Sequence, residues 1–99
     1  MVKGNFQMSD KENFKITNKT KINIPHVDFL TIKNTVLGKD YWLSLVFIGQ
    51  KKSGKLNLAY RGKNNPTNVL SFSLRKKMGE IFITPAVVRK QIKLFDRKF

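Results

Sequence analysis

The sequence predicts an α+β fold, with helices packed on a small mixed β-sheet. Its length of 99 residues is typical of one domain. Hydrophobic residues make up 40% of the chain, which is enough to form a core. The expected elements follow in the order strand, helix, strand, short helix, strand, strand, helix, and this order is typical of a layered α+β protein.

The N-terminal part of the chain is expected to hold one strand at the edge of the sheet. Residues 1–13 are polar, and we interpret them as a flexible lead or as sequence upstream of a misassigned start codon. Within 14–24, apolar residues alternate on either side of an interruption at 18–20, which indicates an edge strand that Pro25 ends. The alternating residues are Phe14, Ile16, Ile22 and Ile24.

A short amphipathic helix is expected over 27–37, and a buried strand over 41–48. Asp28 lies in the first turn of the helix, and Gly38 follows it where a left-handed residue often stands. The strand is almost continuously apolar, which predicts a central place in the sheet. The expected apolar face of the helix consists of Val27, Leu30 and Leu37, flanked by Ile32 and Val36.

The next segment is expected to be a basic turn over 49–54, one or two helical turns over 55–60, and a loop over 61–66. Residues 49–55 also match the spacing G-x-x-x-x-G-K of phosphate-binding loops. That loop needs a Ser or Thr hydroxyl for Mg²⁺ directly afterwards, and Leu56 has none. A basic turn is therefore the better interpretation.

The remaining chain is expected to form strands over 67–74 and 80–83, joined by a turn, and then a helix that begins at Thr84-Pro85. One apolar stripe runs along this helix at Val88, Ile92, Phe95 and Phe99. Since the stripe is still running at its last residue, we expect residues 14–99 to be the N-terminal part of a domain that is incomplete at its C-terminus.

Positive charge is the strongest signal in the composition. The chain has 20 Lys and Arg residues against 6 Asp and Glu, a net charge of +14. No acidic residue lies between Asp40 and Glu80, where basic residues are frequent. Such a field attracts polyanions, so we expect a nucleic acid as partner. A lysine-rich proteome with solvated lysines is the alternative.

Most classes of active site lack their residues in this sequence. Cysteine is absent, so no disulfide and no thiolate metal site can form. The one histidine, His26, cannot supply the three ligands of a hydrolytic zinc site, and we assign no metal ligand. The N-terminus has no apolar signal region, and the longest apolar run, 43–48, is far below the roughly 20 residues that span a bilayer. We expect a cytoplasmic protein with no membrane contact.

The segment 56–72, L-N-L-A-Y-R-G-K-N-N-P-T-N-V-L-S-F, carries the densest set of candidate binding groups. Arg61 can clamp a phosphate with its planar fork, and Lys63 adds a point charge. Tyr60 can stack on an unpaired base. In the alternative interpretation, Tyr60 belongs to the core, Arg61 is an ordinary exposed charge, and Thr67-Asn68 only caps a turn.

This segment resembles L-N-x-x-Y-R-G-K-[DN]-x-P-T-[DN]-V-L-S-F of the bacterial YbeY family of rRNA maturation endoribonucleases. The string G-E-I-F-I at 79–83 is similar to the strand G-[DE]-I-x-I of that family, and the likeness covers about residues 14–99. It implies a metal-dependent, single-strand-specific endoribonuclease in 16S rRNA 3′-end maturation and ribosome biogenesis. It also implies small-subunit rRNA and the small ribosomal subunit as partners.

The resemblance implies Arg61 as the catalytic residue, near the metal and the RNA. The candidate RNA-binding residues are Tyr60, Lys63, Lys51, Lys52, Lys76 and Lys77. Asn64 stands where the family usually has Asp, a change that we expect to be mild because Asn keeps the turn chemistry. The family's Zn²⁺ is held by three histidines in H-G-x-L-H-L-x-G-x-D-H, which this chain lacks. A non-catalytic module that binds RNA or the ribosome is therefore the alternative.

Overall fold

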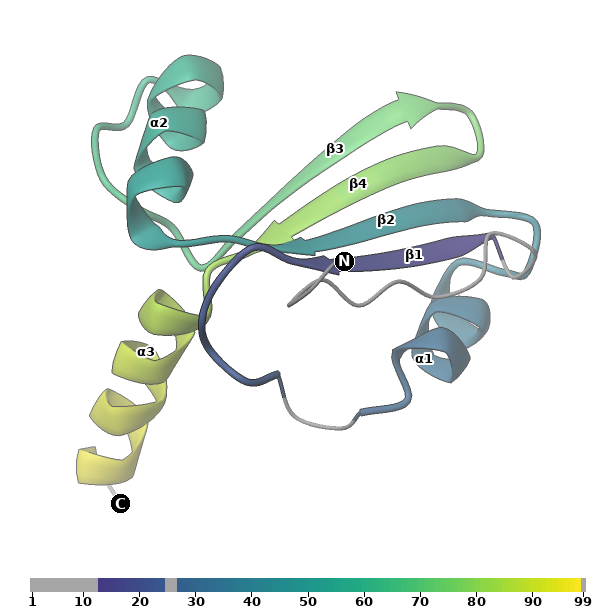
Figure 1. Ribbon diagram of the computed structural model, residues 1–99. Coiled ribbons are helices and arrows are strands. Elements are labelled where there is room, and N and C mark those ends of the chain that lie inside the picture. The colour runs from purple at the N-terminus through teal and green to yellow at the C-terminus, as the bar shows by residue number, and fades with distance from the viewer. Residues whose placement is uncertain (1–12, 25–26, 99) are drawn as a thin grey trace.

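The structure is a computed structural model that describes residues 13–24 and 27–98, with side chains described up to Gln91. Within these residues, a four-stranded mixed sheet and three helices confirm the expected α+β fold and its element order. Residues 1–12 of the lead expected over 1–13, the only histidine, and the apolar stripe after Val88 lie outside the described residues or side chains. Figure 1 shows α1 against one face of the sheet, with α2 and α3 beyond one end of it.

The sheet has the strand order β1-β2-β4-β3. Strands β1 (Phe14–Asn18) and β4 (Met78–Ile83) both run parallel to β2 (Trp42–Phe47). Strand β3 (Val69–Arg75) runs antiparallel to β4 and forms the other edge. The predictions that the first strand lies at an edge and the second in the interior are thus confirmed.

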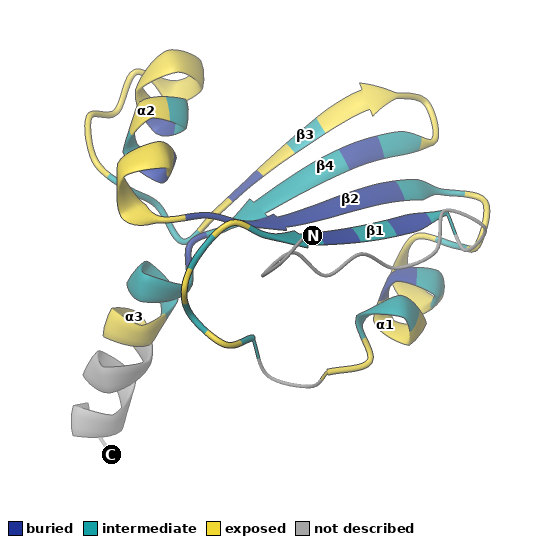
Figure 2. Ribbon diagram, viewed as in Figure 1, coloured by how far each residue is buried: buried dark blue, intermediate teal, exposed yellow. Residues whose placement is uncertain are grey.

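The core lies on the face of the sheet that α1 (Phe29–Val36) covers. Burying a large apolar side chain stabilises a fold by roughly 1.5–3 kcal/mol. The buried cluster comes entirely from β1 and β2, the two neighbouring parallel strands, as Figure 2 shows by their dark colour. It consists of Phe14, Ile16, Leu43, Leu45 and Phe47, against which Phe29, Leu30, Ile81 and Ile83 pack.

Strand β1 ends at Asn18, so the prediction of one interrupted strand over 14–24 is wrong. The side chain of Asn18 accepts hydrogen bonds from the backbone N–H of Thr20 at 2.9 Å and from its hydroxyl. It also donates to the backbone oxygen of Ile22 at 2.9 Å. A side chain that bonds to its own backbone in this way favours a turn over a strand ladder, because it satisfies the groups that pairing would use.

Helix α1 begins after Asp28, whose carboxylate caps it. The hydroxyl and the backbone N–H of Thr31 donate to this carboxylate at 2.7 and 3.1 Å and lower the pKa of Asp28 below its ordinary value. The cap therefore stabilises α1 above the ordinary pKa of Asp and is lost as the pH falls through the lowered one. Gly38 has φ 95°, which confirms the predicted left-handed residue after the helix.

The predicted apolar face of α1 is wrong, apart from Leu30. The helix turns Phe29, Leu30 and Lys33 towards the sheet, with the rings of Phe29 and Phe47 6.0 Å apart. Lys33 is buried because its ammonium donates to Asn34 Oδ1 and to the backbone oxygen of Lys39. The side chains expected inside are exposed: Val27, Ile32, Val36 and Leu37.

Helix α2 runs from Gln50 to Arg61, so a basic turn over 49–54 was the wrong prediction. The backbone N–H of Ser53 donates to the oxygen of Gly49 at 3.0 Å as part of the first helical turn. A phosphate-binding loop is a non-helical turn in front of its helix, whereas residues 50–54 are already helical, so this segment is not such a loop. The helical turns expected over 55–60 are confirmed as the second half of α2. The apolar pattern missed the first half because the buried side chains of the helix, Ser53 and Asn57, are polar.

Strands β3 and β4 form a hairpin whose turn is Lys76-Lys77. The predicted alternation in β3 is confirmed. Leu70 pairs with Phe82 and Phe72 with Glu80 on one face of the sheet. Ser71 and Ser73 lie on the other face, opposite Ile81 and Gly79 of β4. Strand β4 begins two residues earlier than expected, at Met78. Helix α3 (Pro85–Lys98) begins at the predicted proline.

Candidate nucleic-acid interface

The segment 61–63 of the motif lies at the C-terminal end of α2 and in the turn that follows. Gly62 has φ 71°, a left-handed conformation that glycine adopts without strain. Its N–H donates to the oxygen of Leu58 at 3.1 Å, and the N–H of Lys63 donates to the oxygen of Asn57 at 3.4 Å. These bonds close the helix, so Arg61 is its last residue and Lys63 follows two residues later, both exposed.

Ser53 fixes the loop after α2 against the helix. Its side chain has no exposed surface, and its hydroxyl oxygen accepts a bond from the backbone N–H of Thr67 at 3.0 Å. The same hydroxyl donates to the backbone oxygen of Thr67 at 3.0 Å. One serine thus satisfies both backbone groups of Thr67, a residue that lies 14 positions further along the chain.

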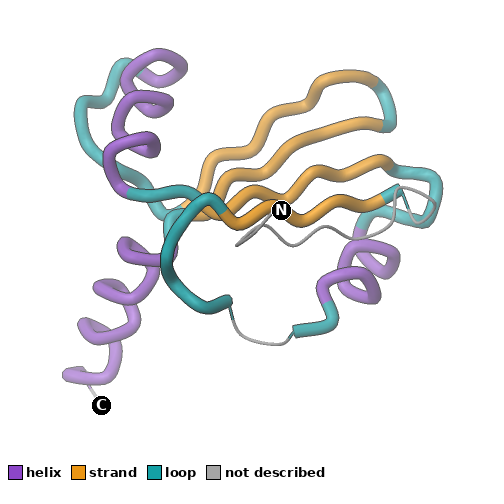
Figure 3. Tube along the Cα trace, in the orientation of Figure 1, coloured by secondary structure: helices purple, strands orange, loops and turns teal. Residues whose placement is uncertain are grey.

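Asn57 adds a second tie one helical turn further on. Its amide nitrogen donates to the backbone oxygen of Asn65 at 2.8 Å, while its side chain is only 2% exposed. Among the described residues, Asn57 Oδ1 has no partner, so Asn57 holds the loop through its nitrogen. Ser53 and Asn57 therefore keep residues 62–67 alongside α2, and Figure 3 shows this loop returning beside the helix.

We expect Ser53→Ala to lower the free energy of unfolding by about 1–3 kcal/mol, because it leaves two partly buried backbone groups without their partner. Urea unfolding of the full chain measures this loss. Ser73→Ala is the matched control, since Ser73 is exposed on β3, and it should change stability by less than about 0.5 kcal/mol. Equal effects of both substitutions would contradict the role of Ser53.

Tyr60 carries an exposed aromatic ring at the end of α2. Its ring centroid lies 4.9 Å from that of Phe72 in an edge contact, and Phe72 contacts Phe82 at 5.8 Å. The side chain is nevertheless 67% exposed. Tyr60 is thus held in place by β3 and still offers surface on which a base can stack, so it does not belong to the core.

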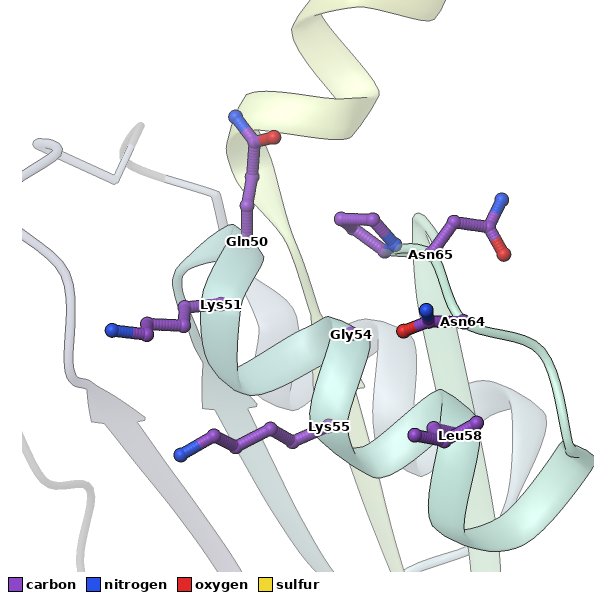
Figure 4. Close-up of a pocket in the computed structure, with 8 residues that line it drawn as sticks. Gln50, Lys51, Gly54, Lys55, Leu58, Asn64 and Asn65 are labelled. Atoms are coloured by element: carbon purple, nitrogen blue, oxygen red, sulfur yellow. The ribbon is translucent and has the colours of Figure 1, made fainter.

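A groove of about 330 Å³ lies between α2 and the returning loop, and we call it the α2 groove. Figure 4 shows Lys51 and Lys55 on one side of Gly54, with Leu58 and Asn64 on the other side. Pro66 closes the groove from the loop. Sequence reasoning did not select Lys55, Asn64 or Asn65 as binding residues, because the groove exists only once the loop folds back on the helix.

The structure separates the predicted RNA-binding residues into three places. Tyr60, Arg61 and Lys63 lie together at the end of α2, whereas Lys51 and Lys52 lie near its beginning. These two groups are about 15 Å apart along the helix axis, at a rise of ~1.5 Å per residue. All of these lysines are exposed.

The third place is the β3–β4 turn with Lys76 and Lys77, at the opposite end of the sheet from α2 (Figure 1). There, Lys77 Nζ lies 3.7 Å from Asp40 Oδ2, and both side chains are largely exposed. An exposed pair of this kind contributes little to stability, but it offsets charge at this turn. Lys76 and Lys77 are therefore not part of the surface that carries Arg61.

The described residues do not fit the zinc ion that the family resemblance implies. Nowhere in the described part of the chain do three His, Cys, Asp or Glu side chains come together. Glu80, which accepts a hydrogen bond from Ser44 at 3.3 Å, lies among no further carboxylates or imidazoles there. Over the same residues, no helix has both the length and the apolar character that crossing a membrane requires.

Comparison with known protein families matches residues 6–99 to the family described as Endoribonuclease YbeY. The chain belongs to the YbeY family. The similarity noted from segments 56–72 and 79–83 is thereby confirmed over nearly the whole sequence. The site residues within that match, Arg61 above all, stay predictions.

Three curated YbeY relatives illustrate the similarity. Endoribonuclease YbeY of Thermodesulfovibrio yellowstonii is 35% identical over 77 residues, which cover 71% of this chain and 46% of the relative. That of Bdellovibrio bacteriovorus is 42% identical over 53 residues, 52% of this chain and 35% of the relative. That of Thermotoga maritima is 29% identical over 62 residues, 61% and 41% respectively. The chain thus spans less than half the length of these relatives.

Proposed function

We propose that this chain supplies the RNA-binding surface of a YbeY-type endoribonuclease that acts on single-stranded RNA. The observation that carries the proposal is the exposed Tyr60-Arg61-Gly62-Lys63 string of the family motif, which Ser53 and Asn57 hold on a fixed helix end. Membership in the YbeY family supports an RNA substrate. The positive charge of the chain supports a polyanionic one.

Arg61 acts in this proposal by binding the oxygens of one phosphodiester. Its guanidinium presents a planar fork of N–H donors, which matches two phosphate oxygens and stabilises the negative charge that grows there during cleavage. Lys63 attracts the same phosphate group as a point charge, and Tyr60 stacks on an adjacent unpaired base. Duplex RNA keeps its bases stacked, so this arrangement favours single strands.

The finer parts of the proposal concern the biological setting. We infer that the substrate is small-subunit rRNA, that the reaction is 16S rRNA 3′-end maturation on the small ribosomal subunit, and that the protein is cytoplasmic. The zinc ion of the family would need ligands that the described residues do not supply. Arg61 and Tyr60 bind RNA without it, so a non-catalytic RNA- or ribosome-binding module is the second candidate.

A binding and cleavage assay on the full chain tests this function. We expect a labelled single-stranded 12-mer from the 16S rRNA 3′ region to bind about tenfold more tightly than its duplex, because a stacked base contributes about 1–3 kcal/mol. Fluorescence anisotropy measures the affinities, and gel electrophoresis with and without added Zn²⁺ detects cleavage. Cleavage by this chain would contradict the non-catalytic module, and tighter binding of the duplex would contradict the proposal.

A further inference from the structure

The α2 groove has the size and the floor of a small binding site. Its volume of about 330 Å³ lies at the lower end of the range of roughly 300–1,000 Å³ for small-molecule sites. Gly54 leaves the middle of the floor without a side chain, and Leu58, which is 49% exposed, gives it an apolar end. A flat ring with apolar faces can lie on such a floor.

The border of the groove carries positive charge and no acidic residue. Lys51 and Lys55 lie one helical turn apart, so both ammonium groups stand on the same side of Gly54, as Figure 4 shows. Neither lysine faces a carboxylate within the groove, because no Asp or Glu lines it. This side therefore suits a ligand with one or two phosphate groups.

Amide side chains line the rest of the groove. Those of Gln50 and Asn64 each offer two N–H donors and one carbonyl acceptor. Such groups pair with the polar edges of bases that have left a stack. Because Ser53 and Asn57 fix the loop, Asn64 stays opposite the helix before any ligand binds, which reduces the entropy cost of binding.

We propose that the α2 groove binds one unpaired nucleotide of single-stranded RNA. Its base lies over Gly54 against Leu58 and Pro66, its polar edge pairs with Asn64, and its flanking phosphates contact Lys51 and Lys55. The groove thereby adds a nucleotide site beside the surface at Arg61, since Leu58 at its end lies about one helical turn before Arg61. This inference rests on the proposed function, since it takes RNA as the ligand.

The test compares two short RNAs that differ in a single base. One is a uridine pentanucleotide, and the other has the same phosphates but lacks the central base. We expect the full chain to bind the intact RNA about fivefold more tightly, a difference that reports the base alone. In Gly54→Met, whose side chain fills the floor, the intact RNA should bind no better than the abasic one.

Gly54→Ala is the matched control for the fold and for the helix. A Cβ at this position would meet Pro66 N at 3.8 Å, an ordinary contact, so the variant should fold and its melting temperature should not fall below that of the wild type. Leu58→Ser tests the floor without any added bulk and should lower the preference to about twofold or less. Circular dichroism checks that each variant retains its helices.

The lysines are tested through the salt dependence of binding. The double substitution Lys51→Gln/Lys55→Gln should reduce the slope of log affinity against log salt by about 1.4, the value for two phosphate contacts on a single strand. The reduction should be the same for intact and abasic RNA. Lys15→Gln/Lys21→Gln, which changes the net charge equally away from the groove, should reduce it by less than about half as much.

Three results would overturn the inference. Equal affinity of the wild-type chain for intact and abasic RNA would mean that no base enters the groove. Displacement of RNA by uridine monophosphate at equal concentration would assign the groove to a free nucleotide. Displacement by an oligoglutamate, abolished in Gly54→Met, would assign it to an acidic peptide. In each case RNA binding at Arg61 would still stand, whereas loss of all RNA binding by the wild-type chain would refute the proposed function itself.

Discussion

Replacing Arg61 with alanine is expected to weaken the binding of single-stranded RNA by the full chain about 10–100-fold. Hydrogen bonds to a charged group contribute about 1.5–3 kcal/mol, and each 1.4 kcal/mol is about tenfold in affinity. Arg61 is exposed at the end of α2, so its loss removes a phosphate contact and leaves the fold intact. Fluorescence anisotropy with a single-stranded RNA measures the change.

Two variants separate the position of this charge from its presence. Arg89→Ala removes the same charge from an exposed place on α3, and we expect it to change affinity less than about twofold. Arg61→Lys keeps the charge but loses the planar fork, so it should fall between the wild type and Arg61→Ala. Similar losses in Arg61→Ala and Arg89→Ala would mean that only net charge matters.

The catalytic role of Arg61 is testable in a protein that also carries the three-histidine element of the YbeY family. There, substitution of the arginine in the Y-R-G-K string should abolish cleavage while the melting temperature stays the same. Full cleavage by that variant would remove Arg61 from the proposed active site, even if it still contributed to RNA affinity.

Gly79→Ala is expected to cause the largest loss of stability among single-methyl changes in the described sheet. A Cβ at Gly79 would overlap Tyr41 Oη and would lie 3.1 Å from the backbone oxygen of Phe72. Overpacking of this kind costs about 1–3 kcal/mol. For a domain of this size the melting temperature should fall by roughly 5–20 °C, which thermal unfolding monitored by circular dichroism measures.

The same glycine-to-alanine change at Gly54 should have the opposite sign. Gly54 lies within α2 and has room for a Cβ, so alanine should stabilise the helix by up to about 1 kcal/mol. Combining Gly79→Ala with Tyr41→Phe should recover part of the lost stability, because the hydroxyl no longer meets the new methyl group. A melting temperature of Gly79→Ala within about 2 °C of the wild type would refute this packing.

Gly79 and Arg61 illustrate two kinds of residue in the two strings that resemble the family. Gly79 is required by the fold, because the phenol of Tyr41 lies over it on β4. Arg61 is exposed, so packing within the fold gives no reason for an arginine at this position. The two predicted phenotypes differ accordingly: loss of stability for Gly79 and loss of RNA affinity for Arg61.

Much of the architecture was predictable because local patterns encode it. Alternation in 69–74 predicted the two faces of β3, a continuous apolar run predicted the interior strand β2, and Pro85 marked the start of α3. The motif Y-R-G-K and the net charge of +14 pointed to RNA before any geometry was known. Each of these signals depends on neighbouring residues or on composition, so no contact distant in sequence is needed to detect it.

Other features depended on contacts between distant parts of the chain. The first half of α2 was missed because the buried side chains of the helix are polar. Ser53 and Asn57 become favourable inside only when Thr67 and Asn65 supply their partners. The buried face of α1 was misjudged for a more local reason. Lys33 is buried with its ammonium bonded to Asn34 Oδ1 in the same helix and to the backbone oxygen of Lys39 shortly after it. The placing of the lysines at three separate sites, and the groove between α2 and its loop, likewise follow from how the chain folds back on itself. A periodic apolar pattern records which side chains avoid water, whereas the burial of a polar side chain requires a hydrogen-bond partner that only the tertiary structure provides.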